Sequence, residues 1–312
     1  MAALQQVVVL FLLMIIGYVI KKLGVISNDM NRDVSNLVIN VALPAFIIRA
    51  MNFSFTPEVL VKSGKLVIIS SCIYIFVITF SFLLAKIMKI QGKARDIFQF
   101  AVVFSNGGYM GYPVIKALIG DIGVFYAALY NFPFNILLWT LGVHFLTRNN
   151  SKKNENSGLR KSIDVIKKFM NPAMIAVIIG FILFLFSIKL PYPLYTTLDL
   201  LGNLTIPLAM LFIGSILADV KSTEIFTEKR VFIISFIRLL IIPILTMFIL
   251  KLVGFSDHLL IIPVIITAMP VAANAPIMAS MFNNDYHLAS KVVFLSTFFS
   301  VVTIPLIIMM VN

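Results

Sequence analysis

Three glycines and a proline interrupt one apolar stretch of this sequence, where residues 104–113 read FSNGGYMGYP. The surrounding run, residues 97–119, is otherwise long and apolar enough to cross a bilayer as a helix. Proline removes a helix donor and clashes with the preceding turn, and glycine weakens a helix while letting another backbone come close. At membrane depth, non-helical backbone is tolerated only where protein buries it or where it lines a wet cavity. The stretch therefore predicts a helix broken inside a membrane.

A second interruption repeats the first in the other half of the chain. Residues 268–276 read AMPVAANAP, and an offset of 163 residues places Pro113 on Pro276. The alternative is a pair of proline kinks that only aid packing. Because the two stretches are related and carry Asn106 and Asn274, we favour two broken helices that form a site.

The same offset aligns other uncommon residues. It places Asn40 on Asn203 and Pro44 on Pro207, so an Asn-x-x-x-Pro pattern recurs. Each half holds five apolar runs, an odd number, so the second half enters the membrane inverted relative to the first. Inverted repeats are typical of secondary transporters. The predicted organisation is a first five-helix repeat (1–146), a cytoplasmic linker (147–170) and a second, inverted repeat (171–312).

Composition supports a membrane protein and excludes a soluble fold. Of the 312 residues 60% are hydrophobic and only 12% are charged, with a mean hydropathy of +1.03. Soluble domains are usually about half apolar and a quarter charged. We therefore predict an all-α membrane protein of ten transmembrane helices, with the fourth and ninth broken and crossing. The predicted spans are 4–20, 34–52, 66–88, 97–119, 123–146, 171–188, 199–219, 231–253, 258–283 and 288–311.

The net charge of +12 reflects basic loops rather than a nucleic-acid surface. If the N-terminus lies outside, the cytoplasmic loops carry 18 Lys and Arg and the opposite side carries five. Cytoplasmic loops of membrane proteins carry such an excess. We expect a multi-pass protein of a bacterial inner membrane, surrounded by lipid, with both termini outside the cytoplasm and no nucleic-acid partner.

The broken helices predict an anion site. Proline is favoured in a first helical turn, so Pro113 and Pro276 are each expected to open a second half-helix. The amides and positive dipole end of such a half-helix favour an anion. Asn106 and Asn274 add side-chain donors. Asn40 and Asn203 are expected either to hydrogen-bond between helices or to line the substrate path.

At these residues the chain resembles the auxin efflux carrier family, which includes plant PIN proteins and bacterial malate- and malonate-type permeases. The resemblance covers essentially the whole chain. It rests on Val41-Ala42-Leu43-Pro44, Asn106 followed by Met110-Gly111-Tyr112-Pro113, Ala268-Met269-Pro270, and Ser296-Thr297 to Ile304-Pro305. The long hydrophilic loop of the plant proteins is absent, so its phosphorylation control is not carried over.

The resemblance implies an elevator-type transporter of bile-acid-symporter or NhaA-like architecture. It implies that spans 1, 2, 6 and 7 form a dimerising scaffold, that spans 3–5 and 8–10 move, and that a small carboxylate such as malate, malonate or an auxin-like acid binds at the crossing. The expected substrate-binding residues are Asn106, Gly107, Gly108, Tyr109, Pro113, Pro270, Asn274, Ala275, Pro276, Asn40 and Asn203. No cofactor or metal is expected. Asn274 fits the bacterial pattern better than the plant one.

Several alternatives stay open. Arg238 lies within the eighth span, where it either anchors the helix by reaching to the interface or has a function. We find no Asp or Glu inside a span, which weighs against a cation/proton antiporter of similar fold. Proton symport, sodium symport, uniport and exchange of two acids all remain possible. An intramembrane enzyme is disfavoured because no His-Glu-x-x-His, Gly-x-Ser-x-Gly or paired mid-membrane Asp occurs.

Overall fold

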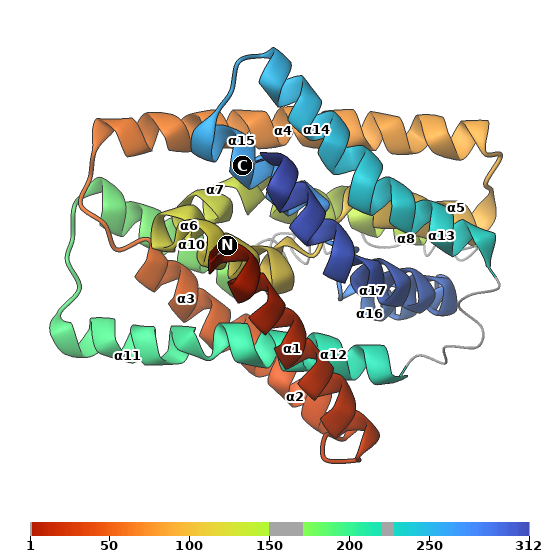
Figure 1. Ribbon diagram of the computed structural model, residues 1–312, viewed down its shortest axis with the longest axis horizontal. Helices are drawn as coiled ribbons and strands as arrows, with labels where there is room; N and C mark the ends of the chain where they lie inside the picture. Colours follow the sequence, from red (N-terminus) through yellow and green to blue (C-terminus); the bar gives the residue numbers. More distant parts are fainter. Residues whose placement is uncertain (1, 150–170, 220–227, 312) are drawn as a thin grey trace, which may run out of the picture. The chain divides into compact units, whose positions relative to one another are not determined.

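The computed structural model describes residues 2–149, 171–219 and 228–311. These residues form helices, and their only β-type pairing is one isolated bridge (Figure 1). Most of the predicted linker, from residue 150 to residue 170, lies outside the described residues.

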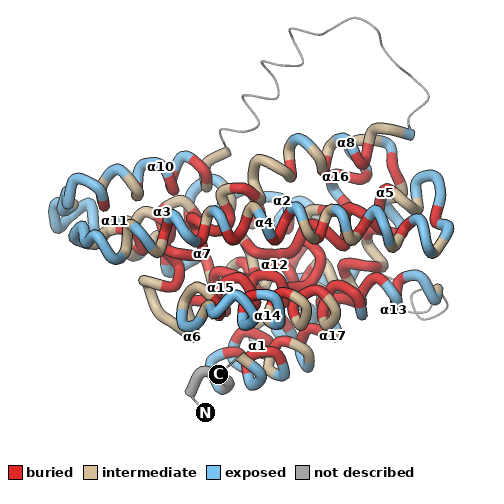
Figure 2. The backbone as a smooth tube through the Cα atoms, turned by 90° about the horizontal axis from the view of Figure 1, so that it is seen from above, coloured by how far each residue is buried: buried red, intermediate tan, exposed pale blue. Residues whose placement is uncertain are grey.

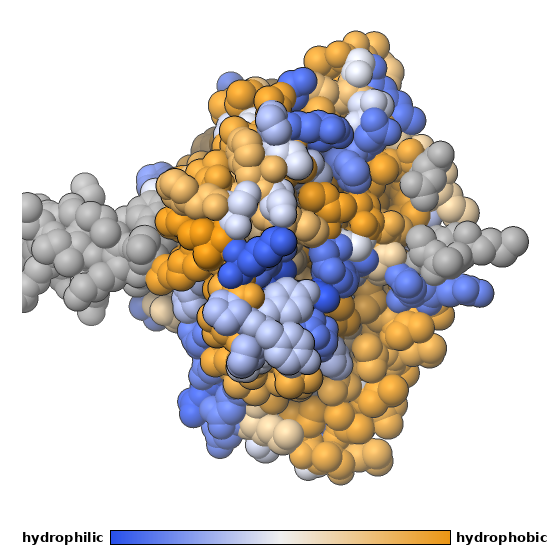
Figure 3. Space-filling model, turned by 90° about the vertical axis from the view of Figure 1, so that its left-hand side faces the viewer, coloured by the Kyte–Doolittle hydropathy of each residue, from blue (hydrophilic) through white to orange (hydrophobic). Residues whose placement is uncertain are grey.

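Seven helical stretches within the described ranges are long and apolar enough to cross a membrane. They are Gln5–Lys22, Asp29–Ala50, Pro57–Ile87, Asp121–Thr147, Tyr192–Asp219, Lys229–Leu252 and Tyr286–Val311. Large apolar side chains stay exposed along them, for example Ile15 at 58% and Ile68 at 65%, and Figure 3 shows apolar side chains over much of one face. Such surface is typical of contact with lipid. The chain is therefore an all-α, multi-pass membrane protein.

The other three predicted spans are not single long helices. The sixth is the 14-residue helix α10 (Pro172–Leu185). The fourth consists of α5 (Gly92–Val103), the π-helical turn η2 (Gly107–Gly111) and α6 (Tyr112–Ile119), and the ninth of α15 (Asp257–Ala268) and α16 (Ala275–Met281).

Some predicted helix ends are wrong. Helix α4 (Pro57–Ile87) begins nine residues before the predicted start of the third span. Helix α11 (Tyr192–Asn203) begins seven residues before the predicted start of the seventh span. The first turns of both helices contain proline and polar residues. These residues are compatible with a helix, but they are not part of an apolar run, so the predicted spans left them out. Glu58 and Lys62 pair at 2.7 Å on the first turns of α4.

Contacts within the chain define two compact units, each assembled from both halves of the sequence. The first comprises Met1–Leu66, Gly108–Tyr130 and Pro172–Lys221, and the second Val67–Gly107, Asn131–Asn171 and Ser222–Asn312. Besides parts of α4 and α7 (Asp121–Leu137), the first unit contains α1 (Ala2–Lys22), α2 (Asn28–Leu37), η1 (Val38–Ala42), α3 (Leu43–Ala50), α6, α10, α11 and α12 (Thr205–Asp219). The second contains α5, η3 (Leu138–Gly142), α8 (Val143–Thr147), α13 (Lys229–Phe236), η5 (Ile237–Ile241), α14 (Ile242–Leu252), α15, α16 and α17 (Tyr286–Val311).

In the first unit, α1 and α12 cross in close contact (Figure 1). Gly17 on α1 and Gly214 on α12 lie where the two backbones meet, since an added Cβ on either would collide with the other helix. Small residues allow membrane helices to approach in this way. A second fixed point is Arg49, which pairs with Asp121 at 2.6 Å and with Asp199 at 2.8 Å and so ties α3 to α7 and α11.

In the second unit, α15 is buried along most of its length (Figure 2). Asp96 on α5 is fully buried and accepts from Arg148 Nε at 2.6 Å and from Asn284 Nδ2 at 3.0 Å. The sequence interpretation placed Asp96 just outside the fourth span. It lies inside α5, near the start of that helix, and its charge is paired.

Candidate substrate site

The first interruption separates α5 from the helical residues that follow it. Helix α5 ends at Val103, and Phe104 is extended with φ −101° and ψ 109°. Helical geometry resumes at Gly107 in the π-helical turn η2, and α6 then begins at Tyr112 with Pro113 in its first turn, as the sequence predicted. Proline lacks the N–H of the α-helical ladder, and the wider π-helical turn η2 accommodates this loss without ending the helix.

The second interruption separates α15 from α16. Helix α15 ends at Ala268, and Met269 is extended with φ −66° and ψ 147°. Helix α16 begins at Ala275 with Pro276 in its first turn, where the sequence predicted a half-helix to start.

The two interruptions lie against each other within the second unit. Ser105 and Val271 form an antiparallel bridge. The Asn106 N–H donates to the Pro270 carbonyl at 2.8 Å, and the Ala272 N–H donates to the Phe104 carbonyl at 3.1 Å. Breaking a helix leaves backbone groups that need new partners in a membrane. Here each interruption supplies partners for the other.

Arg238 lies beside the paired interruptions. Its side chain is 1% exposed, so it does not reach to the interface as the anchoring interpretation expected. Its Nε donates to the carbonyl of Met269 at 3.1 Å, and its Nη1 donates to the carbonyl of Val102 at 3.0 Å. These carbonyls belong to the C-terminal ends of α15 and α5, where helix dipoles favour a cation. One guanidinium therefore stabilises both broken ends.

Two buried asparagines in this region have unmatched polar atoms. Asn106 is 3% exposed, and its Nδ2 has no hydrogen-bond partner among the described residues. Asn131 on α7 is equally buried, and its Oδ1 is likewise without a partner there. A Cβ added to Gly107 would lie 3.1 Å from Asn131 Oδ1. Buried amide groups without partners are costly, so they mark a place where a ligand can bind.

Of the remaining predicted site residues in this unit, Pro270 uses its carbonyl in the backbone pairing. Asn274 is the N-cap residue of α16, but its side chain makes no capping hydrogen bond and is half-buried. Ala275 and Pro276 are buried in the first turn of the same helix. The second unit thus brings Asn106, Gly107, Pro270, Asn274, Ala275 and Pro276 into two paired segments.

The other predicted residues belong to the first unit. The Tyr109 hydroxyl hydrogen-bonds with Ser35 Oγ at 2.8 Å, and Gly108 precedes Tyr109 in η2. Pro113 borders a cavity of about 340 Å³ that Gln6 and Lys116 also line.

Asn40 and Asn203 are exposed and bond within their own helices, to Asn36 O at 2.8 Å and to Asp199 Oδ2 at 3.3 Å. Among the described residues, neither side chain makes the interhelical hydrogen bond that the packing interpretation expected. Their place in a substrate path stays a prediction.

Sequence analysis missed Asn131 and did not connect Arg238 with the interruptions. Asn131 is an amide side chain within an apolar run, two residues before Pro133, and this combination could have singled it out. Nothing in the sequence indicates that Arg238 contacts residues 102 and 269. Among the described residues, no three His, Cys, Asp or Glu side chains cluster as a metal site.

Exposed apolar helices together with a pair of interrupted helices are typical of a membrane transport protein. Comparison with known proteins identifies the family. Residues 2–308 match the family model described as membrane transport protein, so the chain belongs to this family, the auxin efflux carrier family that the sequence resembled.

The relatives agree with this assignment. An uncharacterized transporter of Methanocaldococcus jannaschii is 24% identical over 98% of both chains. The uncharacterized transporter YfdV of Escherichia coli K12 is 25% identical over 95% of this chain and 94% of its own. The lysosomal cholesterol signaling protein of Mus musculus is 22% identical over 93% of this chain and 35% of that protein.

Proposed function

We propose that this membrane transport protein is a secondary transporter of small organic anions, with a carboxylate bound at the paired interruptions. The observation that carries the proposal is the buried Nδ2 of Asn106, a hydrogen-bond donor without a partner among the described residues, directly beside the backbone pairing. A carboxylate is an acceptor-only ligand that satisfies such a donor.

The charge at the interruptions also favours an anion. Arg238 brings a buried positive charge to the carbonyls of Val102 and Met269. No Asp or Glu lies in residues 100–112 or 259–284. An anion entering this region therefore meets a cation and amide donors but no acidic side chain from these segments. Attraction of this kind is strong where the effective dielectric constant is low.

Alternating access by two inverted repeats is supported by the element boundaries. The helix starts of the two halves can be compared by subtracting 163 from the residue numbers of the second half. The start of α15 then falls two residues after the start of α5, the start of α16 coincides with that of α6, and the start of α17 falls two residues after that of α7. Two like halves inserted in opposite directions allow a carrier to exchange inward- and outward-facing states.

The elevator arrangement is supported by how the units are composed. The spans that the family resemblance assigns to the scaffold correspond to α1, α2–α3, α10 and α11–α12, and all of them fall in the first unit together with Gly108–Tyr130. In the proposal this scaffold forms a homodimer, and a monomeric mass in both mild detergent and lipid discs would contradict that part.

Sodium coupling is a second candidate, favoured by the oxygen of Asn131. This Oδ1 is buried and without a described partner, and sodium is a hard cation that oxygen ligands suit. A carrier that binds an anion beside Asn106 and sodium beside Asn131 would be a sodium-coupled symporter. Proton coupling through Asp96 is less favoured because Arg148 already pairs with that carboxylate.

The test is uptake of short mono- and dicarboxylates into proteoliposomes, with and without sodium, by the native chain and by Asn106→Ala. Loss of a hydrogen bond to a charged group costs about 1.5–3 kcal/mol. We therefore expect Asn106→Ala to weaken substrate binding by about ten- to a hundredfold. The matched control is Asn36→Ala, which removes an exposed amide of α2 that is not among the predicted site residues and should leave affinity unchanged.

Two results would overturn the proposal. Normal carboxylate binding and uptake by Asn106→Ala would remove the site. Exchange of sodium for protons in the absence of any organic acid would replace the function with cation antiport.

A further inference from the structure

A cavity of about 650 Å³ lies in the second unit, where α4 ends and α5 begins. Its lining includes Phe82, Leu83, Lys86, Lys89, Arg95 and Gln99. All of these residues fall in one contact unit, and none belongs to the paired interruptions.

The cavity is positively charged. Lys86, Lys89 and Arg95 supply three cations, and no Asp or Glu lines the cavity among the described residues. None of the three makes an ion pair with a described residue. The Nε of Arg95 is buried and has no hydrogen-bond partner within the described chain. An anion would therefore meet cations that no described residue neutralises.

A fixed polar side chain forms part of the same wall. Gln99 is 1% exposed, and its Oε1 accepts a hydrogen bond from Arg148, which the buried Asp96 holds in place. Its Nε2 has no partner among the described residues. Because the oxygen is already occupied, this side chain has a donor left for an acceptor such as a phosphate oxygen.

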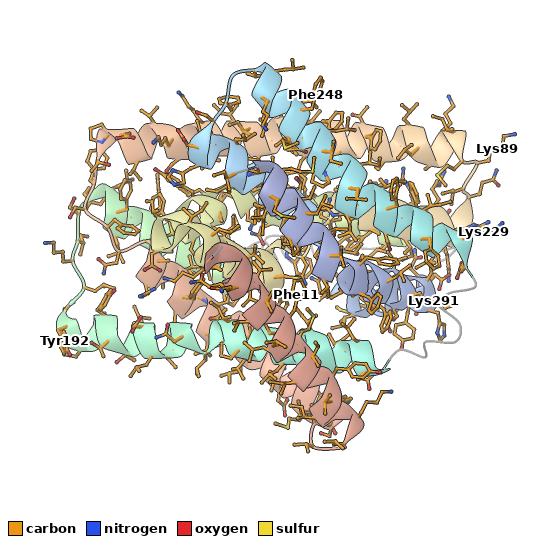
Figure 4. All side chains as sticks on the ribbon, viewed as in Figure 1. Phe11, Lys89, Tyr192, Lys229, Phe248 and Lys291 are labelled. Carbon is orange, nitrogen blue, oxygen red and sulfur yellow. The ribbon has the colours of Figure 1, made fainter. Side chains whose placement is uncertain are left out.

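The apolar part of the lining faces outward. Phe82 is 45% exposed and Leu83 is 54% exposed on the last turns of α4, a helix apolar enough to span a membrane. Lys89 lies at the same end of the unit as Lys291 (Figure 4). Basic residues beside an apolar span end attract anionic lipid at the cytoplasmic surface.

We propose that this cavity binds the headgroup of an anionic phospholipid. The lipid phosphate lies among Lys86, Lys89 and Arg95 and accepts from Gln99, while an acyl chain runs along Phe82 and Leu83. A soluble phosphate would use the cations alone. A lipid uses both the cations and the exposed apolar residues, which is why the lining favours the lipid. The proposal is independent of the substrate proposed above.

The experiment measures lipid binding to the purified full-length protein by native mass spectrometry and by thermal shift. The probes are phosphatidylglycerol, phosphatidylcholine with the same acyl chains, and inorganic phosphate. The test variant is Lys86→Gln/Arg95→Gln. The matched control is Lys229→Gln/Arg230→Gln, which removes one Lys and one Arg that are exposed on α13 and do not line the cavity.

We expect the native chain and the control to bind phosphatidylglycerol more tightly than phosphatidylcholine. The cavity variant should bind phosphatidylglycerol about 30-fold more weakly and lose the preference. Equal binding of both lipids to the native chain, equal losses in the two variants, or stabilisation by inorganic phosphate that matches phosphatidylglycerol would each overturn the proposal. The comparison of lipids on the native chain decides the matter even if the cavity variant does not fold.

Discussion

The guanidinium of Arg238 satisfies carbonyls at the ends of two helices that stop inside the second unit. A buried arginine is costly in a membrane, and here two helix C-termini offset that cost. The same side chain places a positive charge beside the segment that carries Asn106, so one residue has both a structural role and an electrostatic effect on the proposed site.

Replacing Arg238 should therefore lower the stability of the protein. Arg238→Gln removes two charge-assisted hydrogen bonds, each worth about 1.5–3 kcal/mol, so we expect a clear fall in the thermal unfolding temperature in detergent. Arg238→Lys keeps the charge but loses the planar fork that reaches two carbonyls, so it should recover only part of the stability.

The control is Arg230→Gln, which changes an exposed arginine of α13 and should leave the unfolding temperature close to that of the native chain. If Arg238→Gln unfolds at the same temperature as Arg230→Gln, the two carbonyl contacts do not stabilise the broken helices.

Among the helices, α1 and α12 show how closely two elements pack in the first unit. A Cβ on Gly214 would lie against the carbonyl oxygen of Met14 and 2.9 Å from the backbone nitrogen of Tyr18. Both obstacles are backbone atoms, which cannot move aside as a flexible side chain can.

Gly214→Ala should consequently force the two helices apart. Overpacking of this kind costs about 1–3 kcal/mol, which would appear as a lower unfolding temperature. Gly64→Ala is the matched control, because nothing lies within 4 Å of an added Cβ there, and alanine favours helix by up to about 1 kcal/mol. Equal stability of the two variants would show that the close approach of α1 and α12 is not needed.

The interrupted helices show how far element boundaries follow from local sequence. Pro276 stands in the first turn of α16 and Pro113 in the first turn of α6, as predicted, but only α6 is preceded by a helical turn, η2. Both are prolines after a glycine- or alanine-rich stretch, and the sequence does not distinguish them. What differs is the surrounding packing, which decides whether the residues before a proline are helical.

For the molecule as a whole, the excess of Lys and Arg on one side predicts its orientation. The predicted cytoplasmic loops carry 18 of the 25 basic residues, and both termini are expected outside the cytoplasm. A C-terminal reporter that is active only in the cytoplasm should be inactive, and one active only outside should work. The reverse pattern would contradict the orientation and, with it, the inverted repeat.

The sequence by itself determined the membrane class, the family and the positions of the two interruptions. Composition, apolar runs and proline or glycine placement act locally, so they are visible in a single chain. The pairing of Ser105 with Val271, the contacts of Arg238 with Val102 and Met269, and the approach of Asn131 to Gly107 were decided only by the tertiary structure. Apart from Arg238 with Met269 and Asn131 with Gly107, these contacts join residues more than 130 positions apart. Even the nearer pairs belong to different segments of the fold, and only packing determines which segments meet.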